Sequence, residues 1–415
     1  MASRFVQFLA ALAGVLCLLP DGAHAQACGE LPPAVGELPR LAILPVTVRP
    51  VQSTLTPVPA TDGLIHIAFA AQVTNLAPET TTVVSIVPVD PLNGFQPSGA
   101  NKVLDVNDAD ITGKVRLFSP PAGGRTDVSD VPAGASGMAF FDVTYAKADD
   151  VPRLLSTRIT VQPQGADAPL SADSDPVPVA CEPPVVLSPP LIGDRWWNGN
   201  GCCEVVGPHR GATLPVNGDI KPPEQFAIDW VQLNEKNECC SGPVTDLNSW
   251  PFFRAPILAA AAGTVVAAVN NEPEQVPGPP KGITADNAPG NHIVEDIGNG
   301  RYILYAHLHT GSIPPSITVG SVLSPGQKIG ELGNTGSSTS PHLHFQVMDR
   351  PSALDSIGLP FVFDHQIVQG HVAGPSGSAD EAYEGGRAVD FVKDGTGWQY
   401  GRMPAAGQVF AFPAN

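Results

Sequence analysis

Four histidines stand in two H-x-H triplets, a spacing that could build a metal site. The triplets are His307-Leu308-His309 and His342-Leu343-His344. On a β-strand, residues i and i+2 point to the same face, so each triplet can present two imidazoles to one site. Imidazole is a common zinc ligand, and a catalytic zinc ion usually has three protein ligands and one open position. The two triplets together indicate a catalytic metal site.

The segments that must position these triplets contain short motifs. The most specific stretch runs from Gly333-Asn334-Thr335-Gly336 to His342-Leu343-His344-Phe345. Others are Tyr305-Ala306-His307-Leu308, residues 322–330, and the expected strands at residues 256–266 and 291–294. Together these segments resemble the M23 (lysostaphin/LytM-like) zinc endopeptidases, over about residues 205–350. The resemblance implies a lysostaphin-like antiparallel β-sheet peptidase domain.

The resemblance also implies roles for five side chains. His344 corresponds to a metal ligand, and His307 and His342 correspond to catalytic histidines. The family's other ligands lie in an H-x3-D motif, from which this sequence departs. The best candidates are His209 and Asp229, twenty residues apart, with an insertion between them. The implied cofactor is one Zn2+ ion held by His209, Asp229 and His344.

From the residues alone, other interpretations stay open. Asp229 could cap a turn, and His209 could be an ordinary loop residue. His309 would share a strand face with His307, so spacing makes it a rival for contact with the site. The resemblance assigns it no role.

The implied reaction is hydrolysis of peptide bonds in peptidoglycan crosslinks through a metal-activated water. His307 and His342 would orient the water, stabilise the oxyanion and protonate the leaving amine. One alternative is a catalytically inactive LytM-like regulator that binds the cell wall or activates an amidase. Another is a hydrolase that acts on a protein outside the wall.

The N-terminal half is predicted to be an immunoglobulin-like β-sandwich. Short runs rich in Val, Ile, Thr and Phe alternate there with Pro, Gly, Asn and Asp turns. The predicted organisation is a signal peptide (1–25), the sandwich domain (26–181), a Pro-rich linker (182–191), the peptidase domain (192–373) and a C-terminal tail (374–415) that adds at most an edge strand. The fold class is therefore mainly β.

The first 25 residues predict export. Arg4 precedes an apolar stretch, and Ala23-His24-Ala25 supplies small residues for cleavage. The mature chain is expected to be periplasmic or extracellular and to have no stable membrane span, because no other apolar run reaches about 18 residues. The net charge of −18 makes nucleic acid and anionic membranes poor partners.

Cysteine usage fits the same compartment. Six of the seven cysteines follow the signal peptide. We predict a Cys28–Cys181 bridge and two bridges between the Cys202/Cys203 and Cys239/Cys240 pairs. The rival interpretation is a zinc site with four cysteine ligands, although vicinal pairs lack the usual C-x2-C spacing.

Overall fold

The computed structural model describes residues 42–102, 115–117, 127–203, 207–374 and 383–414. These residues form mostly antiparallel sheets, so the prediction of a mainly β protein is confirmed. The predicted signal peptide and Cys28 lie outside the described residues. None of the described helices is long and apolar enough to cross a membrane.

Two antiparallel sheets form the N-terminal half, and we call them the N-terminal sheet pair. Their strand orders are β1-β3-β10-β7-β8 and β12-β11-β4-β5. The main strands are β1 (Val46–Pro50), β3 (Ile65–Asn75), β4 (Thr81–Asp90), β5 (Gln96–Pro97), β7 (Val115–Leu117), β8 (Asp127–Val128), β10 (Ser136–Tyr145), β11 (Leu154–Pro163) and β12 (Leu170–Asp173). Apolar side chains from both sheets share one core, including Phe69, Phe141, Ile86 and Ile159. An immunoglobulin-like topology stays a prediction.

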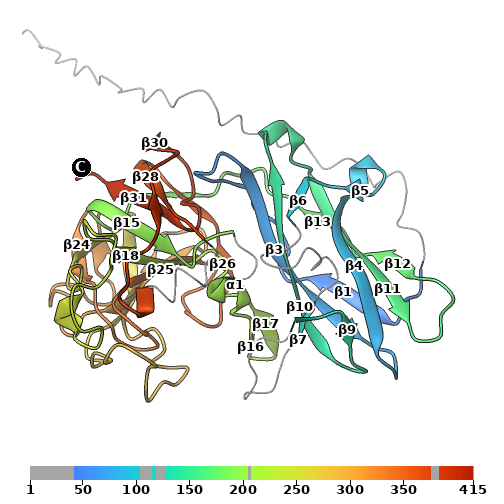
Figure 1. Cartoon of the computed structure of the whole chain (residues 1–415), viewed down its shortest axis with the longest axis horizontal. Coiled ribbons are helices and arrows are strands. Elements are labelled where there is room, and N and C mark those ends of the chain that lie inside the picture. Colours follow the sequence, from blue (N-terminus) through green and yellow to red (C-terminus); the bar gives the residue numbers. More distant parts are fainter. Residues whose placement is uncertain (1–41, 103–114, 118–126, 204–206, 375–382, 415) are drawn as a thin grey trace, which may run out of the picture.

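Strands β3 and β10 are buried on both faces. Along β3, Ile67 and Phe69 face the core of the sheet pair, whereas Ala68 and Ala70 belong to other buried clusters. This division follows from the two-residue period of a strand. Figure 1 shows the second body of the protein beside the sheet pair, with α1 (Pro208–Gly211) and β17 (Asp219–Lys221) between them. The outer face of β3 and β10 is therefore an internal packing surface.

A long antiparallel sheet organises the second body. Among the described residues its order is β23-β20-β21-β22-β25-β18-β15-β31-β28-β29, and β26 and β30 pair with β25 and β28. The strands are β15 (Gly193–Gly199), β18 (Ile228–Gln232), β20 (Gly263–Val269), β21 (Asn291–Asp296), β22 (Tyr302–Leu308), β23 (Val322–Leu323), β25 (Leu343–Met348), β26 (Gly358–Leu359), β28 (Gln366–Val372), β29 (Phe391–Val392), β30 (Gly397–Gln399) and β31 (Gln408–Phe412).

The segments expected to be a linker and a tail are part of this body. Strand β14 (Val185–Leu187) pairs in parallel with β27 (Phe361–Phe363), and Leu187 is buried. Strand β31 lies between β15 and β28, so it is an interior strand and not the expected edge strand. Its Phe410 and Phe412 are fully buried against Trp230. Burial of these aromatic rings explains why the chain end joins the sheet.

The predicted bridges between the two cysteine pairs are wrong. Cys202 and Cys203 form a disulfide with each other, and Cys239 and Cys240 are free, buried thiols. In the β15–β18 ladder, Gly199 lies opposite Asp229 and Trp196 opposite Gln232. Cys202 and Cys203 therefore follow β15 at one end of this ladder, and Cys239 and Cys240 follow β18 at the opposite end. The predicted Cys28–Cys181 bridge stays a prediction, because Cys28 is not described.

A buried carboxyl lies in the middle of the long sheet. Glu295 on β21 has no exposed surface, and its Oε2 accepts a hydrogen bond of 2.8 Å from Tyr305 Oη on β22. Tyr305 Oη in turn accepts a hydrogen bond of 2.7 Å from the Ala260 N–H. Burial raises the pKa of Glu295 to about 7, and the Tyr305 hydrogen bond offsets only part of this effect.

We expect Glu295 to make folding stability depend on pH. Because its pKa is raised from 4.5 to about 7 in the folded protein, its contribution is complete below pH 4.5 and is lost as pH rises through 7. The loss amounts to up to about 3 kcal/mol. In Glu295→Gln, the difference in Tm between pH 5.5 and pH 8.5 should be smaller than in the wild type. Thermal unfolding with Glu79→Gln as an exposed control checks this, and parallel pH profiles for all three proteins would contradict it.

Candidate metal centre

Three neighbouring strands bring the central side chains together. In the ladders, Asp229 on β18 lies opposite His344 on β25, and His344 lies opposite Ala306 on β22. His307 follows Ala306 with a left-handed φ of 62°, a conformation that is uncommon for residues other than glycine. His209 comes from the single turn α1, outside the sheet. Strand register thus aligns Asp229 and His344 and places His307 directly after that row.

The Asp229 carboxylate is the centre of the cluster. Its Oδ1 lies 3.0 Å from His344 Nδ1 and 3.3 Å from His342 Nε2, and its Oδ2 lies 3.1 Å from His209 Nε2. Asn200 Nδ2 donates a hydrogen bond of 2.9 Å to the same Oδ2. The structure therefore brings together four of the five side chains that the sequence analysis selected around one oxygen pair.

The second nitrogen of each imidazole donates to a protein oxygen. His209 Nδ1 donates to the Ala227 carbonyl at 3.1 Å, and His344 Nε2 donates to Gln346 Oε1 at 2.8 Å. His307 Nδ1 donates to the Thr335 carbonyl at 2.7 Å, and His342 Nδ1 donates to the Ser340 carbonyl at 2.8 Å. These hydrogen bonds fix which nitrogen of each neutral ring keeps its lone pair.

His307 completes the cluster beside these rings. Its ring centroid lies 4.7 Å from that of His342 and 5.9 Å from that of His344. Two sets of potential ligand atoms each lie within 4.8 Å of one another: His209 with Asp229 and His344, and His307 with His342 and His344. His344 belongs to both sets. The cluster can therefore hold a cation on the Asp229 side with two histidines beside it.

The charges of the cluster depend on one another. Burial alone would lower the pKa of His209, but the Asp229 carboxylate raises it to about 9, and the same carboxylate raises the pKa of His342. Burial would raise the pKa of Asp229, yet the neighbouring His209 and His342 hold it well below its usual value. Burial, followed by the nearby His342 and His344, lowers the pKa of His307. The Asp229 carboxylate and the rings of His209 and His342 therefore stabilise each other's charged forms.

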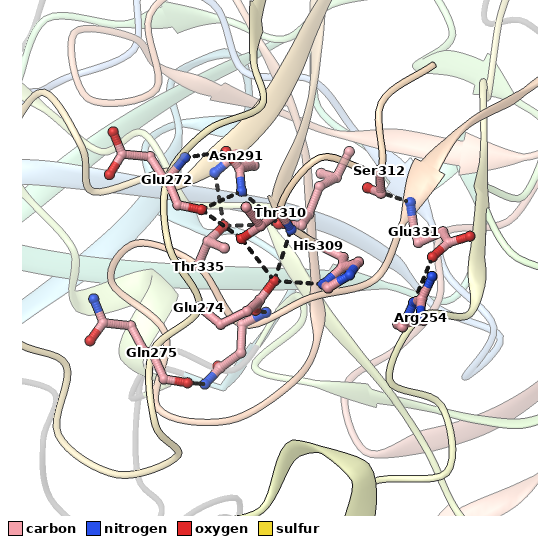
Figure 2. Close-up of polar contacts among 12 residues, drawn as sticks. Arg254, Glu272, Glu274, Gln275, Asn291, His309, Thr310, Ser312, Glu331 and Thr335 are labelled. Atoms are coloured by element: carbon pink, nitrogen blue, oxygen red, sulfur yellow. Dashed lines mark hydrogen bonds and ion pairs between the residues drawn. The ribbon is translucent and has the colours of Figure 1, made fainter. Parts of the chain in front are cut away.

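His309 does not join the cluster, although its spacing made it a candidate. Its Nδ1 lies 2.7 Å from Glu274 Oε1, which also accepts the Thr310 N–H at 2.8 Å (Figure 2). Glu274 Oε2 accepts the Asn334 N–H at 2.7 Å. Glu274 therefore joins the segment before β21 to the loop whose Thr335 carbonyl holds His307.

Three residues of this neighbourhood were missing from the sequence-based site. Asn200 donates a hydrogen bond to Asp229, and Gln346 accepts one from His344. Glu274 accepts the Asn334 N–H in the loop that contains Thr335. Gln346 could have been found, because on β25 it shares a face with His344 by the two-residue period. Asn200 and Glu274 lie far from their partners in the chain and carry no such local signal.

One segment of this body matches a known family model. Residues 252–356 match peptidase family M23. The resemblance noted in the sequence is thereby confirmed for about a quarter of the chain. The M23 segment contains His307, His342 and His344, whereas His209 and Asp229 lie before it.

Solved structures give weaker matches. The catalytic domain of the antimicrobial peptidase lysostaphin from Staphylococcus simulans is 23% identical over 39% of this chain and 86% of that chain, with a TM-score of 0.22. A putative peptidase M23 from Pseudomonas aeruginosa is 15% identical (63% and 91% covered, TM-score 0.22), and a zinc containing peptidase from Vibrio cholerae is 14% identical (70% and 81% covered, TM-score 0.20). Because these TM-scores are low, the M23 assignment rests on the matched segment.

We expect Glu274 to stabilise the Thr335 loop measurably. Glu274→Gln removes the negative charge that the Thr310 and Asn334 N–H groups face, and it leaves one of these two donors without an acceptor. Hydrogen bonds to charged groups contribute about 1.5–3 kcal/mol. The free energy of unfolding should fall by about 2 kcal/mol in urea titrations, and the Asn334 amide should exchange faster. Glu272→Gln is the matched control, because Glu272 contributes main-chain atoms to this network. Equal stability of both variants would refute the assignment.

Proposed function

We propose that this chain is a zinc endopeptidase that hydrolyses peptide bonds in peptidoglycan crosslinks in the periplasm or outside the cell. The observation that carries the proposal is the convergence of His209, Asp229 and His344, with His307 and His342 beside them. The M23 match supports peptidase chemistry. The substrate and the compartment rest on the resemblance to that family and on residues 1–25.

The donor set fits a zinc ion. In their neutral forms, the rings of His209 and His344 donate from one nitrogen to protein oxygens and aim the other nitrogen's lone pair at Asp229 oxygens. Lone pairs facing a carboxylate at about 3 Å repel unless a proton or a cation lies between them. Two imidazole nitrogens and a carboxylate are a ligand set that zinc takes in catalytic sites. We infer that His209 Nε2, Asp229 and His344 Nδ1 hold the ion.

The remaining histidines can handle protons. A zinc ion bound there would act as a Lewis acid and lower the pKa of a water molecule toward about 7. His307 and His342 each donate from Nδ1 to a main-chain carbonyl, so their Nε2 atoms can accept a proton from water. Once protonated, the same Nε2 atoms can stabilise the oxyanion and deliver a proton to the leaving amine.

We expect variants of the ligands to bind less zinc than variants of the proton-transfer histidines. His209→Ala, Asp229→Ala and His344→Ala each remove a ligand and should lower bound zinc, measured by elemental analysis after dialysis. His307→Ala and His342→Ala should keep about one zinc per chain and lose hydrolysis by about 100-fold or more. If the two histidine variants lost zinc as fully as His344→Ala, the alternative set of three histidines would be the metal site.

The catalytic proposal predicts release of new amino termini from peptidoglycan. The chain from Gln26 onward should cleave peptidoglycan or a glycine- or alanine-containing crosslink peptide, and a chelator should abolish the activity until zinc is restored. The full mature chain is needed because β31 is an interior strand. His344→Ala is the control. A zinc-loaded protein that cleaves none of a panel of wall types, yet stimulates an amidase in a mixed assay, would establish the regulator instead.

A further inference from the structure

His209 lacks the support that the other site residues have. Asp229 and His344 lie within paired strands, and His307 lies near the end of β22. His209 lies on the one-turn helix α1, and the chain between it and Asp229 forms only the short hairpin of β16 (Leu214–Val216) and β17. The printed contacts of this turn with the second body run through the His209 ring, which meets the Ala227 carbonyl, Asp229 Oδ2 and the His344 ring. The rest of α1 is held from the other side.

The next residue anchors α1 to the N-terminal sheet pair. Arg210 is 2% exposed, and its Nη2 donates to the Phe141 carbonyl at 2.9 Å and to the Phe69 carbonyl at 3.2 Å. Phe69 and Phe141 lie opposite each other in the β3–β10 ladder. The guanidinium also lies 5.9 Å from the centre of the Phe140 ring. One side chain therefore connects the turn that carries His209 to two strands of the sheet pair.

A second anchor lies just before Asp229. Gln225 is 3% exposed, and its Nε2 donates to the Ala68 carbonyl of β3 at 2.9 Å. Its Oε1 accepts from Gln52 Nε2 at 2.7 Å, and Gln52 Oε1 accepts the Ala70 N–H at 3.3 Å. The segment between the two proposed ligands is thus attached to β3 near both of its ends.

The outer face of β3 is shaped for this contact. Ala68 and Ala70 alternate with the core residues of the sheet pair and leave room for close approach. Ile220 of β17 packs on the cluster formed by Ala70, Met138 and Phe140. Burying a guanidinium is costly unless it is hydrogen-bonded, and burial lowers the pKa of Arg210 to about 10. The Phe69 and Phe141 carbonyls accept from Nη2, whereas Nε and Nη1 are buried without a hydrogen-bond partner among the described residues. The carbonyls therefore offset part of this cost, and only while α1 stays in place.

We propose that the N-terminal sheet pair is part of the metal centre, with Arg210 as the positioning residue that holds His209 on it. This inference rests on the proposed zinc site. The sheet pair supplies no ligand but presents the carbonyls that fix α1. Loss of the anchor leaves Asp229 and His344 on their strands and releases His209. Through this anchor the sheet pair sets the zinc affinity of the site, although its strands lie far from the ligands in sequence.

The test measures zinc affinity of the full mature chain by competition with a chromophoric chelator. Arg210→Met keeps the apolar stem and removes the donors, and it should weaken zinc binding by about 10–100-fold, the usual effect of losing a residue that orients a ligand. Arg158→Met is the matched control, because Arg158 pairs with Asp173 within the other sheet. Its zinc affinity should equal that of the wild type. Unchanged affinity in Arg210→Met would overturn the inference.

A double-mutant cycle with His209→Ala separates positioning from a general loss of stability. In the His209→Ala background, Arg210→Met should weaken zinc binding no further, because the ligand it positions is absent. An equal loss in both backgrounds would overturn the inference. If Arg210→Met does not fold, Gln225→Met provides the same test through the second anchor. A wild-type chain that binds no zinc would instead refute the proposed function, so the two failures can be distinguished.

Discussion

The Asp229 carboxylate sets the constraint on which the rest of the site depends. Its side chain is only 16% exposed and faces three imidazole nitrogens at 3.0–3.3 Å. A charge in such a place is stable only with close, well-directed partners. The registers of β18, β25 and β22 supply His344 and place His307, and α1 supplies His209. Carbonyl and amide oxygens behind the rings then fix their orientation.

The same requirement explains why the two bodies share a packing surface. The turn that carries His209 is anchored on the outer face of β3 and β10, through the Phe69 and Phe141 carbonyls. That face has alanines where close approach is needed, and main-chain carbonyls that accept from Arg210 and Gln225. Burial of both faces gives these two strands a nearly continuous apolar pattern instead of a regular alternation.

The histidine triplets show how far local patterns reach. On a regular strand, both members of a triplet face the same side. The second triplet does so, because His342 forms a β-bridge directly before β25 and approaches the same Asp229 oxygen as His344. The first triplet does not, because His307 has a positive φ. His309 consequently turns toward Glu274, while His307 and His342 approach each other. The residues named from the family resemblance do meet in space, but their ligand and catalytic roles stay predictions.

The sequence by itself determined the mainly β class, the M23 segment and the identity of the five clustered side chains. Strand periodicity and short motifs depend only on residues that are close together in the chain. Tertiary structure alone decided that His209 reaches Asp229 from twenty residues away, that β31 lies between β15 and β28, and that Cys202 pairs with its neighbour Cys203. The first two features depend on which distant segments meet. That choice follows from ladder register and from the need to bury aromatic and charged groups with suitable partners, and neither is visible within a short window of sequence.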